Sequence, residues 1–371
     1  MKTVGIVSEF NPFHNGHKYL IDSVRAQLAP DAVVCIMSGN FVQRGGPALT
    51  DKWTRARMAV TCGADLVVEL PVVYAVSGAP IFAAGGIAIM KGLGLDAVAF
   101  GSESGDMFSL EAKLHDGVTP VDMKNSPNDI LALEYMKQNR AQNAGLEEFT
   151  VQRTGAGHDS MKIGGNTASA SMIRKMVQDG AKVSETADFV PCEAVKILES
   201  GILLGKEGTD RWFDLVRYCL LSKSPEELAA LPAAYGGIEY RLKEAVTSCR
   251  TLGELILTAK AKRYAYAGLS RLLTQMVLGI TSNMVTKAGI TADAAELPAY
   301  ARVLAFNDAG SAFLKELRKT ASIPVITNIG KNLADDAPER ALIDIDARAS
   351  DIYSILIGRQ IYANSDFVLH P

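Results

Sequence analysis

The sequence predicts an α/β fold, with a parallel sheet in the first half of the chain and a mainly helical second half. Two observations carry this prediction. In the first hundred residues apolar, strand-like runs alternate with helical periodicity, as in βαβ units with right-handed crossovers. After about residue 185, long helical patterns dominate. We therefore expect two domains, residues 1–185 and residues 186–371, the second ending in a small α/β coda.

Five short apolar runs predict the strands of the sheet. Each is bounded by polar or glycine residues, as buried strands are. The runs cover Thr3–Ser8, Asp31–Met37, Asp65–Leu70, Asp96–Glu103 and Glu147–Thr154.

The segments between and after these strands have helical spacing. In residues 16–28 four apolar side chains share one face. Thr50 is the expected N-cap of the next helix, and Gly63 follows that helix as its stop. The other predicted helices cover residues 77–91, 168–180, 211–222, 237–250, 252–267, 269–279 and 347–358. The coda consists of strand-like residues 301–307 and 322–328 and the last of these helices.

The composition is that of an ordinary globular protein. The chain has 371 residues, of which 48% are hydrophobic, and its net charge is −3, so any polyanionic partner must bind a local basic patch. The five cysteines form no CxxC pair, which favours reduced thiols and a cytoplasmic location. The N-terminus has no signal-peptide pattern, and Glu69 and Pro71 interrupt the longest apolar run, so we expect no contact with membranes.

Two histidines lie at the joint between the first strand and the first helix. His14, Gly16 and His17 follow the carboxyl end of the strand, where ligands of open parallel sheets bind. Free backbone N–H groups and the helix dipole favour an anion there, and glycine allows a close approach. Two imidazoles beside that anion would stabilise the charge that develops during phosphoryl or nucleotidyl transfer. The alternative is that both side chains only cap the helix.

These residues carry a resemblance to a known superfamily. Phe10–His17, "FNPFHNGH", resembles the HxGH signature of the nucleotidylyltransferases, whose catalytic domain is Rossmann-like. Their second signature has a counterpart in "TASASMIR", Thr167–Arg174. This segment has Ala170 where threonine is usual, so its resemblance to the signature rests on Ser169, Ser171 and Arg174.

A closer resemblance covers most of the chain. The segments "SGNFVQRGGPALTDKWTRARMA", "GADLVVELPVVYA", "FGSE" and "KAKRYAYAGLSRLL" are similar to the bacterial tRNA(Met) cytidine acetate ligases. The similarity is most specific in residues 1–104. It is weaker in residues 105–150, where this chain is shorter than the family pattern, and thin after residue 290.

The resemblance implies a ligase that uses ATP in two steps. Acetate attacks the α-phosphate of ATP, which gives acetyl-adenylate and pyrophosphate. The N4 amine of the wobble cytidine in elongator tRNA(Met) then takes the acetyl group. The sequence contains no metal-ligand cluster, and the implied metal is Mg²⁺, held mostly by the ATP phosphates and water.

The resemblance also assigns the nucleotide site. It makes His14 and His17 catalytic, and it adds Gly101, Asn128 and Arg153 to the ATP site. Gly101 ends a strand where a side chain would block the adenosine, or is a simple turn glycine. Arg174 would bind the β- and γ-phosphates, or is solvated. The implied ATP-binding run is Val7, Ser8, Glu9, Phe10, Asn11, Pro12, Phe13, His14, Asn15, Gly16, His17, Lys18, Tyr19 and Leu20.

A glycine-rich loop follows the second strand at the same edge of the sheet. Its polar residues are Asn40, Gln43 and Arg44, and we expect them to line the acetate and cytidine side of the site. The alternative is a purely structural loop.

A basic segment in the second half is the expected tRNA-binding surface. Residues 240–275 contain seven basic and two acidic side chains, a local charge of +5. Lysine and arginine bind phosphates, and unpaired bases stack on aromatic rings. An ordinary basic helix face is the alternative. The residues expected to bind tRNA are Lys260, Lys262, Arg263, Tyr264 and Arg271.

Two other classes of function stay open on the sequence. An adenylyltransferase of cofactor biosynthesis would share the HxGH motif but use a small-molecule acceptor, and would not need the basic second half. A non-catalytic RNA-binding protein would not need the histidine pair.

Overall fold

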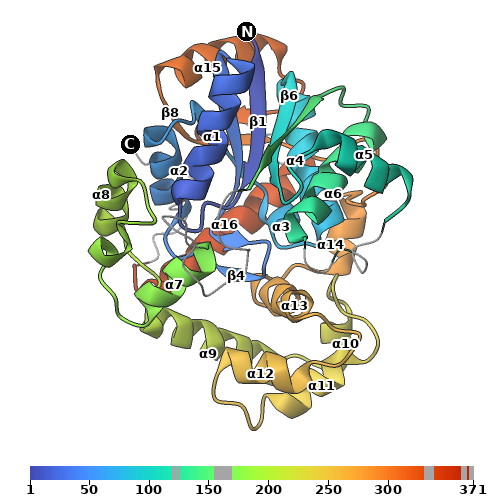
Figure 1. The fold of residues 1–371 in the computed structure, drawn as a ribbon. Helices are drawn as coiled ribbons and strands as arrows, with labels where there is room; N and C mark the ends of the chain where they lie inside the picture. The colour runs from blue at the N-terminus through green and yellow to red at the C-terminus, as the bar shows by residue number, and fades with distance from the viewer. Residues whose placement is uncertain (119–122, 124–125, 154–168, 330–337, 361–365, 367–371) are drawn as a thin grey trace.

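A computed structural model describes residues 1–118, 123, 126–153, 169–329, 338–360 and 366 (Figure 1). Thr154, Thr167 and Ala168, which belong to predicted elements, lie outside these ranges. The strands are β1 Thr3–Ser8, β2 Ala32–Ser38, β3 Phe41–Val42, β4 Gly46–Pro47, β5 Leu66–Leu70, β6 Ala97–Ser102, β7 Glu147–Gln152, β8 Ala301–Phe306 and β9 Val325–Ile326.

Sixteen α-helices and one short 3₁₀ helix accompany these strands in the described ranges. In the first half they are α1 Asn15–Leu28, α2 Lys52–Thr61, α3 Val72–Ala75, α4 Ala79–Leu93, α5 Met107–His115, α6 Pro127–Ala141, α7 Ala170–Gln178 and η1 Val183–Thr186. In the second half they are α8 Cys192–Ser200, α9 Lys206–Ser222, α10 Pro225–Ala229, α11 Ile238–Ala245, α12 Leu252–Ala259, α13 Tyr266–Leu278, α14 Ser282–Lys287, α15 Asp308–Thr320 and α16 Pro338–Leu356.

The main sheet has seven strands in the order β7-β6-β1-β2-β5-β8-β9. The five predicted strands are present and pair in parallel with one another. The order reverses around β1, whose neighbours are β2 and β6. Ligands of such sheets bind at the carboxyl ends next to this reversal. In Figure 1 that edge faces the helices at the bottom of the view, α9 to α13.

Side chains of the central strand β2 alternate between two cores. Val33, Cys35 and Met37 belong to a cluster with α1 and α2 side chains, while Val34 and Ile36 belong to one with α3 and α4 side chains. This is the period of two that a strand imposes. The whole strand is buried, so both faces of the sheet are covered by helices.

Two local predictions about the helices are wrong. Asp51, not Thr50, caps α2, because the Asp51 side chain accepts a hydrogen bond from the Thr54 N–H (2.9 Å). The helix predicted over residues 252–267 ends at Ala259, and a new helix starts at Tyr266. The basic residues between these positions therefore lie in a connection rather than on a helix face.

The strands of the expected C-terminal coda are present and join the main sheet. Strand β8 pairs antiparallel with β5, and β9 pairs with β8, so both extend the main sheet. Buried charges accompany this docking. Lys52 Nζ lies 2.7 Å from Glu69 Oε2 and 2.8 Å from Asp366 Oδ2, and Arg302 Nη1 of β8 lies 2.7 Å from the same Asp366 oxygen. The boundary at residue 185 stays a prediction.

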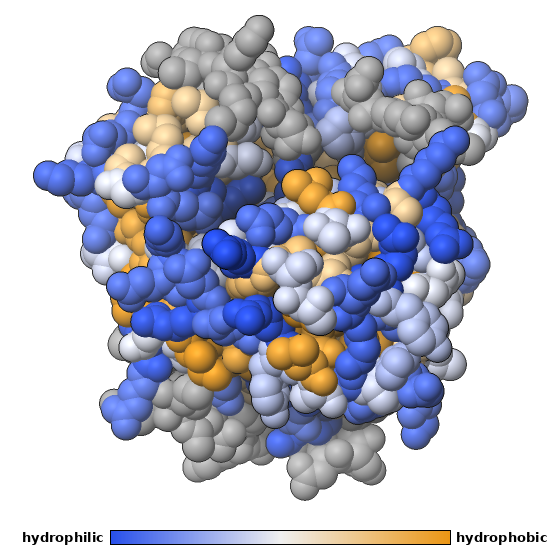
Figure 2. Space-filling view, turned by 90° about the horizontal axis from the view of Figure 1, so that it is seen from below, coloured by the Kyte–Doolittle hydropathy of each residue, from blue (hydrophilic) through white to orange (hydrophobic). Residues whose placement is uncertain are grey.

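The helices α9 to α13, residues 206–278, are called the helical arm. Its buried side chains continue the core that covers the α3 and α4 face of the sheet. The view from below shows this end of the molecule covered mostly by hydrophilic side chains, with small apolar patches between them (Figure 2).

None of the helices in the described ranges combines the length and the apolar composition that a membrane span requires.

Candidate active site

The two motif histidines form a stacked pair at the start of α1. Their ring centroids are 3.7 Å apart, with an angle of 23° between the planes. His14 Nδ1 accepts a hydrogen bond from the Gly16 N–H (3.1 Å), and His17 Nδ1 accepts one from the His14 N–H (3.2 Å). A neutral imidazole has one N–H. Because Nδ1 is the acceptor in both rings, each neutral imidazole carries its hydrogen on Nε2.

Gly16 is required by the position of the His14 ring. A Cβ atom at residue 16 would lie 2.9 Å from His14 Cε1, closer than real Cβ contacts. The first turn of α1 contains no acidic residue, so the positive end of the helix dipole is not neutralised there. The turn can therefore attract an anion.

The rings of two phenylalanines pack against the His17 ring. The ring centroids of Phe10 and Phe13 lie 4.9 Å and 5.5 Å from that of His17. Phe13 is fully buried. Phe10 has a φ of 45°, in the left-handed region that is costly for a bulky side chain. Backbone strain of this kind clusters at functional sites.

A cavity of about 160 Å³, called the inner pocket, opens beside this pair at the carboxyl ends of β1 and β6. Its lining contains eight members of the predicted ATP-binding run: Val7, Ser8, Glu9, Phe10, Asn11, His14, His17 and Leu20. Six other members do not line it: Pro12, Phe13, Asn15, Gly16, Lys18 and Tyr19.

Gly101 and Arg153 meet on the far wall of the inner pocket. A Cβ atom at Gly101 would lie 3.2 Å from Arg153 Cγ, so the glycine makes room for the arginine side chain. The Arg153 N–H donates to the Ser102 carbonyl (2.9 Å), which extends the β6–β7 pairing. Burial lowers the pKa of the Arg153 guanidinium, and the charge of Glu103 opposes this shift.

Asn128 reaches the inner pocket because two carboxylates tie α6 to the end of β6. Glu103 Oε1 accepts from Asn128 Nδ2 (2.5 Å), and Glu103 Oε2 accepts from the Asp129 N–H (2.7 Å). In return, Asp129 Oδ1 accepts from the Glu103 N–H (2.8 Å). Burial alone would raise the pKa of Asp129, but hydrogen bonds from Lys113 and these backbone groups hold it below its ordinary value.

Arg174 lies outside the inner pocket but next to the histidine turn. Its Nη1 donates to the Asn11 carbonyl (2.6 Å) and its Nη2 to Ser171 Oγ (3.2 Å), which ties α7 to the histidine turn. Ser169 caps α7 through the Met172 N–H and lines the inner pocket. Arg174 itself lines a second, larger cavity.

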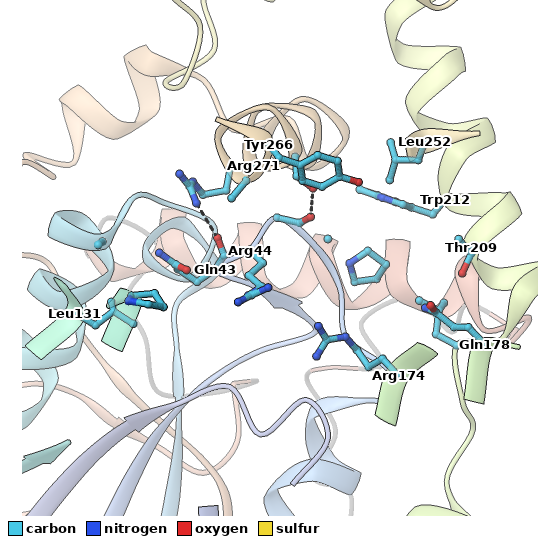
Figure 3. A pocket seen from close by; sticks show the side chains of 18 of the residues that line it. Gln43, Arg44, Leu131, Arg174, Gln178, Thr209, Trp212, Leu252, Tyr266 and Arg271 are labelled. Carbon is cyan, nitrogen blue, oxygen red and sulfur yellow. Dashed lines mark hydrogen bonds between the residues drawn. The ribbon is translucent and has the colours of Figure 1, made fainter. Parts of the chain in front are cut away.

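This second cavity, called the outer cleft, has a volume of about 800 Å³. It shares Gln43, Arg44 and Leu131 with the inner pocket, so the two cavities adjoin at these residues. Its described walls carry three arginines and no carboxylate, which favours an anionic ligand. Figure 3 shows Tyr266, Trp212 and Leu252 along one wall, and Arg44 and Arg174 along the facing one.

The glycine-rich loop is held between the sheet and the helical arm. Glu9 Oε1 accepts from the Gln43 N–H (2.8 Å), and Arg271 Nη1 donates to the Gln43 carbonyl (3.2 Å). Ser270 Oγ donates to the Gly45 carbonyl. Gly45 has a φ of 82° and packs so closely on the α13 backbone that no side chain fits.

The expectation for Asn40 is corrected. Asn40 is 7% exposed and lines neither cavity. Its Oδ1 accepts from the Lys52 N–H (2.8 Å), and its Nδ2 donates to Ser350 Oγ (3.3 Å). Both ends of the amide are thus used to hold α2 and α16, and Asn40 supports the loop without facing a ligand.

The expectation for Tyr264 is also corrected. Tyr264 is 2% exposed, and its hydroxyl donates to the carbonyls of Tyr235 (2.9 Å) and Gly236 (2.8 Å). Its ring is therefore part of the core of the helical arm and cannot stack on a base. Lys260, Lys262 and Arg263 lie exposed in the connection before α13, while Arg271 lines the outer cleft.

Several lining residues were missed by the sequence analysis. Phe82, Phe100 and Tyr135 add aromatic walls to the inner pocket, and Tyr266 and Thr209 line the outer cleft. Only Tyr266 had a signal, since it lies two residues after Tyr264 in the basic segment. The others come from helices and strands whose apolar spacing is indistinguishable from ordinary core.

This chain is similar to known proteins over nearly its whole length. The family model described as HIGH Nucleotidyl Transferase matches residues 1–116 and 109–366. A tRNA(Met) cytidine acetate ligase of Clostridium perfringens (strain ATCC 13124) is 34% identical over 415 residues, covering 100% of this chain and 99% of the relative. One from Limosilactobacillus reuteri (strain DSM 20016) is 34% identical over 385 residues, covering 96% of each chain. The alignment of 415 positions is longer than this chain, so it contains gaps in this chain.

Two solved structures have the same fold over their whole length. The crystal structure of Thermotoga maritima TmcAL in its apo form I has a TM-score of 0.87 and 28% identity, covering 100% of this chain and 99% of the other. The crystal structure of TmcAL bound with alpha-thio ATP has a TM-score of 0.85 and 27% identity, with the same coverage.

Proposed function

This chain belongs to the tRNA(Met) cytidine acetate ligase family, and we propose that it activates acetate with ATP and acetylates N4 of the wobble cytidine of elongator tRNA(Met). The observation that carries the proposal is the stacked pair of His14 and His17, with both Nδ1 atoms held as acceptors beside the inner pocket.

In the first step a carboxylate oxygen of acetate attacks the α-phosphorus of ATP, and the bond to pyrophosphate breaks. Negative charge builds on the phosphate oxygens in the transition state. The Nε2–H groups of His14 and His17 would donate to these oxygens, and the N-terminus of α1 would add its dipole. Because both rings are already held, little reorganisation would be needed during the reaction.

The two cavities support a proposal for how ATP lies in the site. The inner pocket is smaller than the 300–1,000 Å³ usual for ligand sites, so a nucleotide would extend from it toward the outer cleft. We place the adenosine against Gly101, Asn128 and Arg153, and the phosphates toward Arg44 and Arg174. The α-phosphate would then lie by the histidines.

Mg²⁺ would be held mainly by the ATP phosphates and water. Glu9 is the one carboxylate among the described residues of the inner pocket, and its oxygen chemistry fits a hard cation there. The metal would supply charge neutralisation to the triphosphate.

In the second step the N4 amine attacks the carbonyl carbon of the acetyl group, AMP leaves, and the amine loses a proton. The acceptor would approach through the outer cleft, where Gln43 and Arg44 separate it from the inner pocket. Lys260, Lys262 and Arg263 would bind RNA phosphates beside the cleft. Residues 1–185 would thus supply the adenylating part, and the helical arm the tRNA-binding part.

Incubation with ATP and labelled acetate, with and without tRNA, tests this proposal. We expect pyrophosphate and acetyl-adenylate without RNA, and AMP with N4-acetylcytidine when elongator tRNA(Met) is present. ADP and phosphate as products would contradict attack at the α-phosphorus. Acetyl-adenylate formation without RNA acetylation would favour a small-molecule acceptor instead.

A further inference from the structure

The outer cleft has the composition of a site for an extruded nucleotide. Its volume of about 800 Å³ lies within the range of ligand sites. It joins arginines on one side to an exposed aromatic ring on the other, as single-stranded nucleic-acid sites do. A pocket for pyrophosphate alone would not need the aromatic wall.

Tyr266 supplies the accessible ring of this wall. It is the first residue of α13, lines the outer cleft, and is 45% exposed. Trp212 also lines the cleft, but it is only 2% exposed and packs against Phe41, with ring centroids 5.6 Å apart. Tyr264 is buried as well. Of the three rings, only that of Tyr266 offers a face on which a base can stack.

The surroundings of Tyr266 connect it to the reaction centre. Ser270 and Arg271, one turn later on α13, hold the backbone of the Gly45 and Gln43 loop. That loop lines both cavities. A base on Tyr266 would therefore lie in the cleft that opens onto the acyl-adenylate.

We infer that the outer cleft holds the acceptor nucleotide of the RNA, unstacked from its neighbours, with its base on the Tyr266 ring and an adjoining phosphate near Arg271. This inference rests on the proposed function. It makes Tyr266 the residue that positions the acceptor base, in place of Tyr264.

The test is a binding cycle with full-length tRNA, without ATP or acetate. One RNA has cytidine at the acceptor position, and the other has an abasic ribose there. The proteins are the wild type, Tyr266→Ala, Tyr266→Phe and the control Tyr240→Ala, whose side chain is 62% exposed outside the cleft.

Wild type should bind the abasic RNA roughly 5- to 150-fold more weakly, the range for one stacked base. Tyr266→Ala should bind both RNAs with the weaker affinity, while Tyr266→Phe and Tyr240→Ala should still distinguish them. The inference is overturned if Tyr266→Ala still distinguishes the RNAs, if it weakens both alike, or if Tyr266→Phe fails as Tyr266→Ala does.

Acetylation by the wild type distinguishes failure of this inference from failure of the proposed function. A wild type that acetylates cytidine but binds both RNAs equally would overturn only the inference. One that distinguishes the RNAs but forms no acetylcytidine would overturn only the function and leave the base site supported.

Discussion

The inner pocket and the outer cleft adjoin, yet they are built in different ways. The histidines and most of the predicted lining of the inner pocket come from one segment, Val7–Leu20, held by hydrogen bonds among near neighbours. The outer cleft combines the glycine-rich loop with residues of α6, α7, α9, α12 and α13. The inner pocket thus depends on local structure, whereas the outer cleft depends on how distant helices pack.

This difference explains which expectations failed. His14 and His17 lie where the motif predicts, because a strand, a turn and a helix start fix them. On the helical arm, the expectation that failed is the one for Tyr264. Tyr264 and Tyr266 are two residues apart in the same basic segment, but one is 2% and the other 45% exposed. The turn before α13 decides this, and it depends on contacts with Tyr235 and Gly236.

The largest effect should come from removing one of the two histidines of the inner pocket. His14→Ala or His17→Ala should lower the rate of AMP formation about 100-fold or more, the scale for one preorganised donor to developing charge. ATP affinity should fall much less. Single-turnover measurement of AMP and equilibrium binding of ATP separate the two effects.

His14 also caps α1, so a loss of stability in the variant must be separated from a loss of catalysis. His14→Asn keeps a side-chain acceptor for the Gly16 N–H, and should restore stability but not activity. His115→Ala, at a side chain that is 91% exposed on α5, is the matched control. Near-normal turnover in either alanine variant of the pair would remove that histidine from the mechanism.

The next largest effect, on tRNA affinity, should come from reversing basic charges on the helical arm. Changing Lys260, Lys262 and Arg263 together to glutamate should weaken tRNA binding at least tenfold at low salt. Each lost phosphate contact should also flatten the dependence of log affinity on log salt by about 0.7–0.9. Acetate-dependent exchange of pyrophosphate into ATP reports separately on the inner pocket.

The matched control reverses three exposed charges at the other end of the molecule. Lys315, Arg318 and Lys319 lie on α15, opposite the helical arm in Figure 1. Their change to glutamate alters the net charge equally, and should leave most of the salt dependence in place. Equal loss of tRNA binding in both triple variants would mean that net charge, not this surface, attracts the RNA.

A smaller effect concerns the pH dependence of stability, through a buried carboxyl group on α16. Asp346 of α16 accepts from the Val72 N–H (2.7 Å) and from the Tyr300 hydroxyl. Burial raises the pKa of the Asp346 carboxyl to about 8, and the charge of Glu69 adds to the rise. An unfolded aspartate has a pKa of about 3.9, so the folded state binds a proton between these values that the unfolded state does not.

The contribution of the Asp346 proton to the free energy of unfolding is therefore fully present below about pH 4. It is lost as the pH rises toward about 8. Asp346→Asn keeps the acceptor for Val72 and has no proton to lose. Between about pH 5 and pH 8, the Tm of Asp346→Asn should therefore fall by a few °C less than the Tm of the wild type. Asp344→Asn, at an exposed position on the same helix, is the control. Parallel curves for Asp346→Asn and the wild type would contradict a proton on this carboxyl.

The smallest effect separates the two tyrosines. Tyr264→Phe loses a hydroxyl that donates to two carbonyls, and should lower the free energy of unfolding by about 1 kcal/mol without changing tRNA affinity. Tyr266→Phe should change stability less, since its ring is half exposed. Urea unfolding measures the first quantity. A loss of tRNA affinity in Tyr264→Phe at full stability would restore the role first expected for Tyr264.

Much of the fold could be predicted because its signals are local. Apolar runs of strand length located the five parallel strands within one or two residues at their described ends, and Gly63 follows α2 as the predicted helix stop. The errors arose where a long-range contact decided the outcome. Strands β8 and β9 were predicted, but nothing in their sequence shows that β8 pairs with β5 and β9 with β8. The docking of β8 buries Arg302 together with Asp366.

By itself the sequence determined the HxGH turn and its place at a strand end, because hydrogen bonds between residues no more than three apart fix both imidazoles. It also determined the basic charge near Lys260. Only the tertiary structure decided which residues face a cavity. Asn40 and Tyr264 are polar enough for a site, yet both are used inside the core, since a buried polar group must find partners there. The cleft at Tyr266 exists because α9, α12 and α13 pack beside the loop, and such packing depends on contacts that no single segment contains.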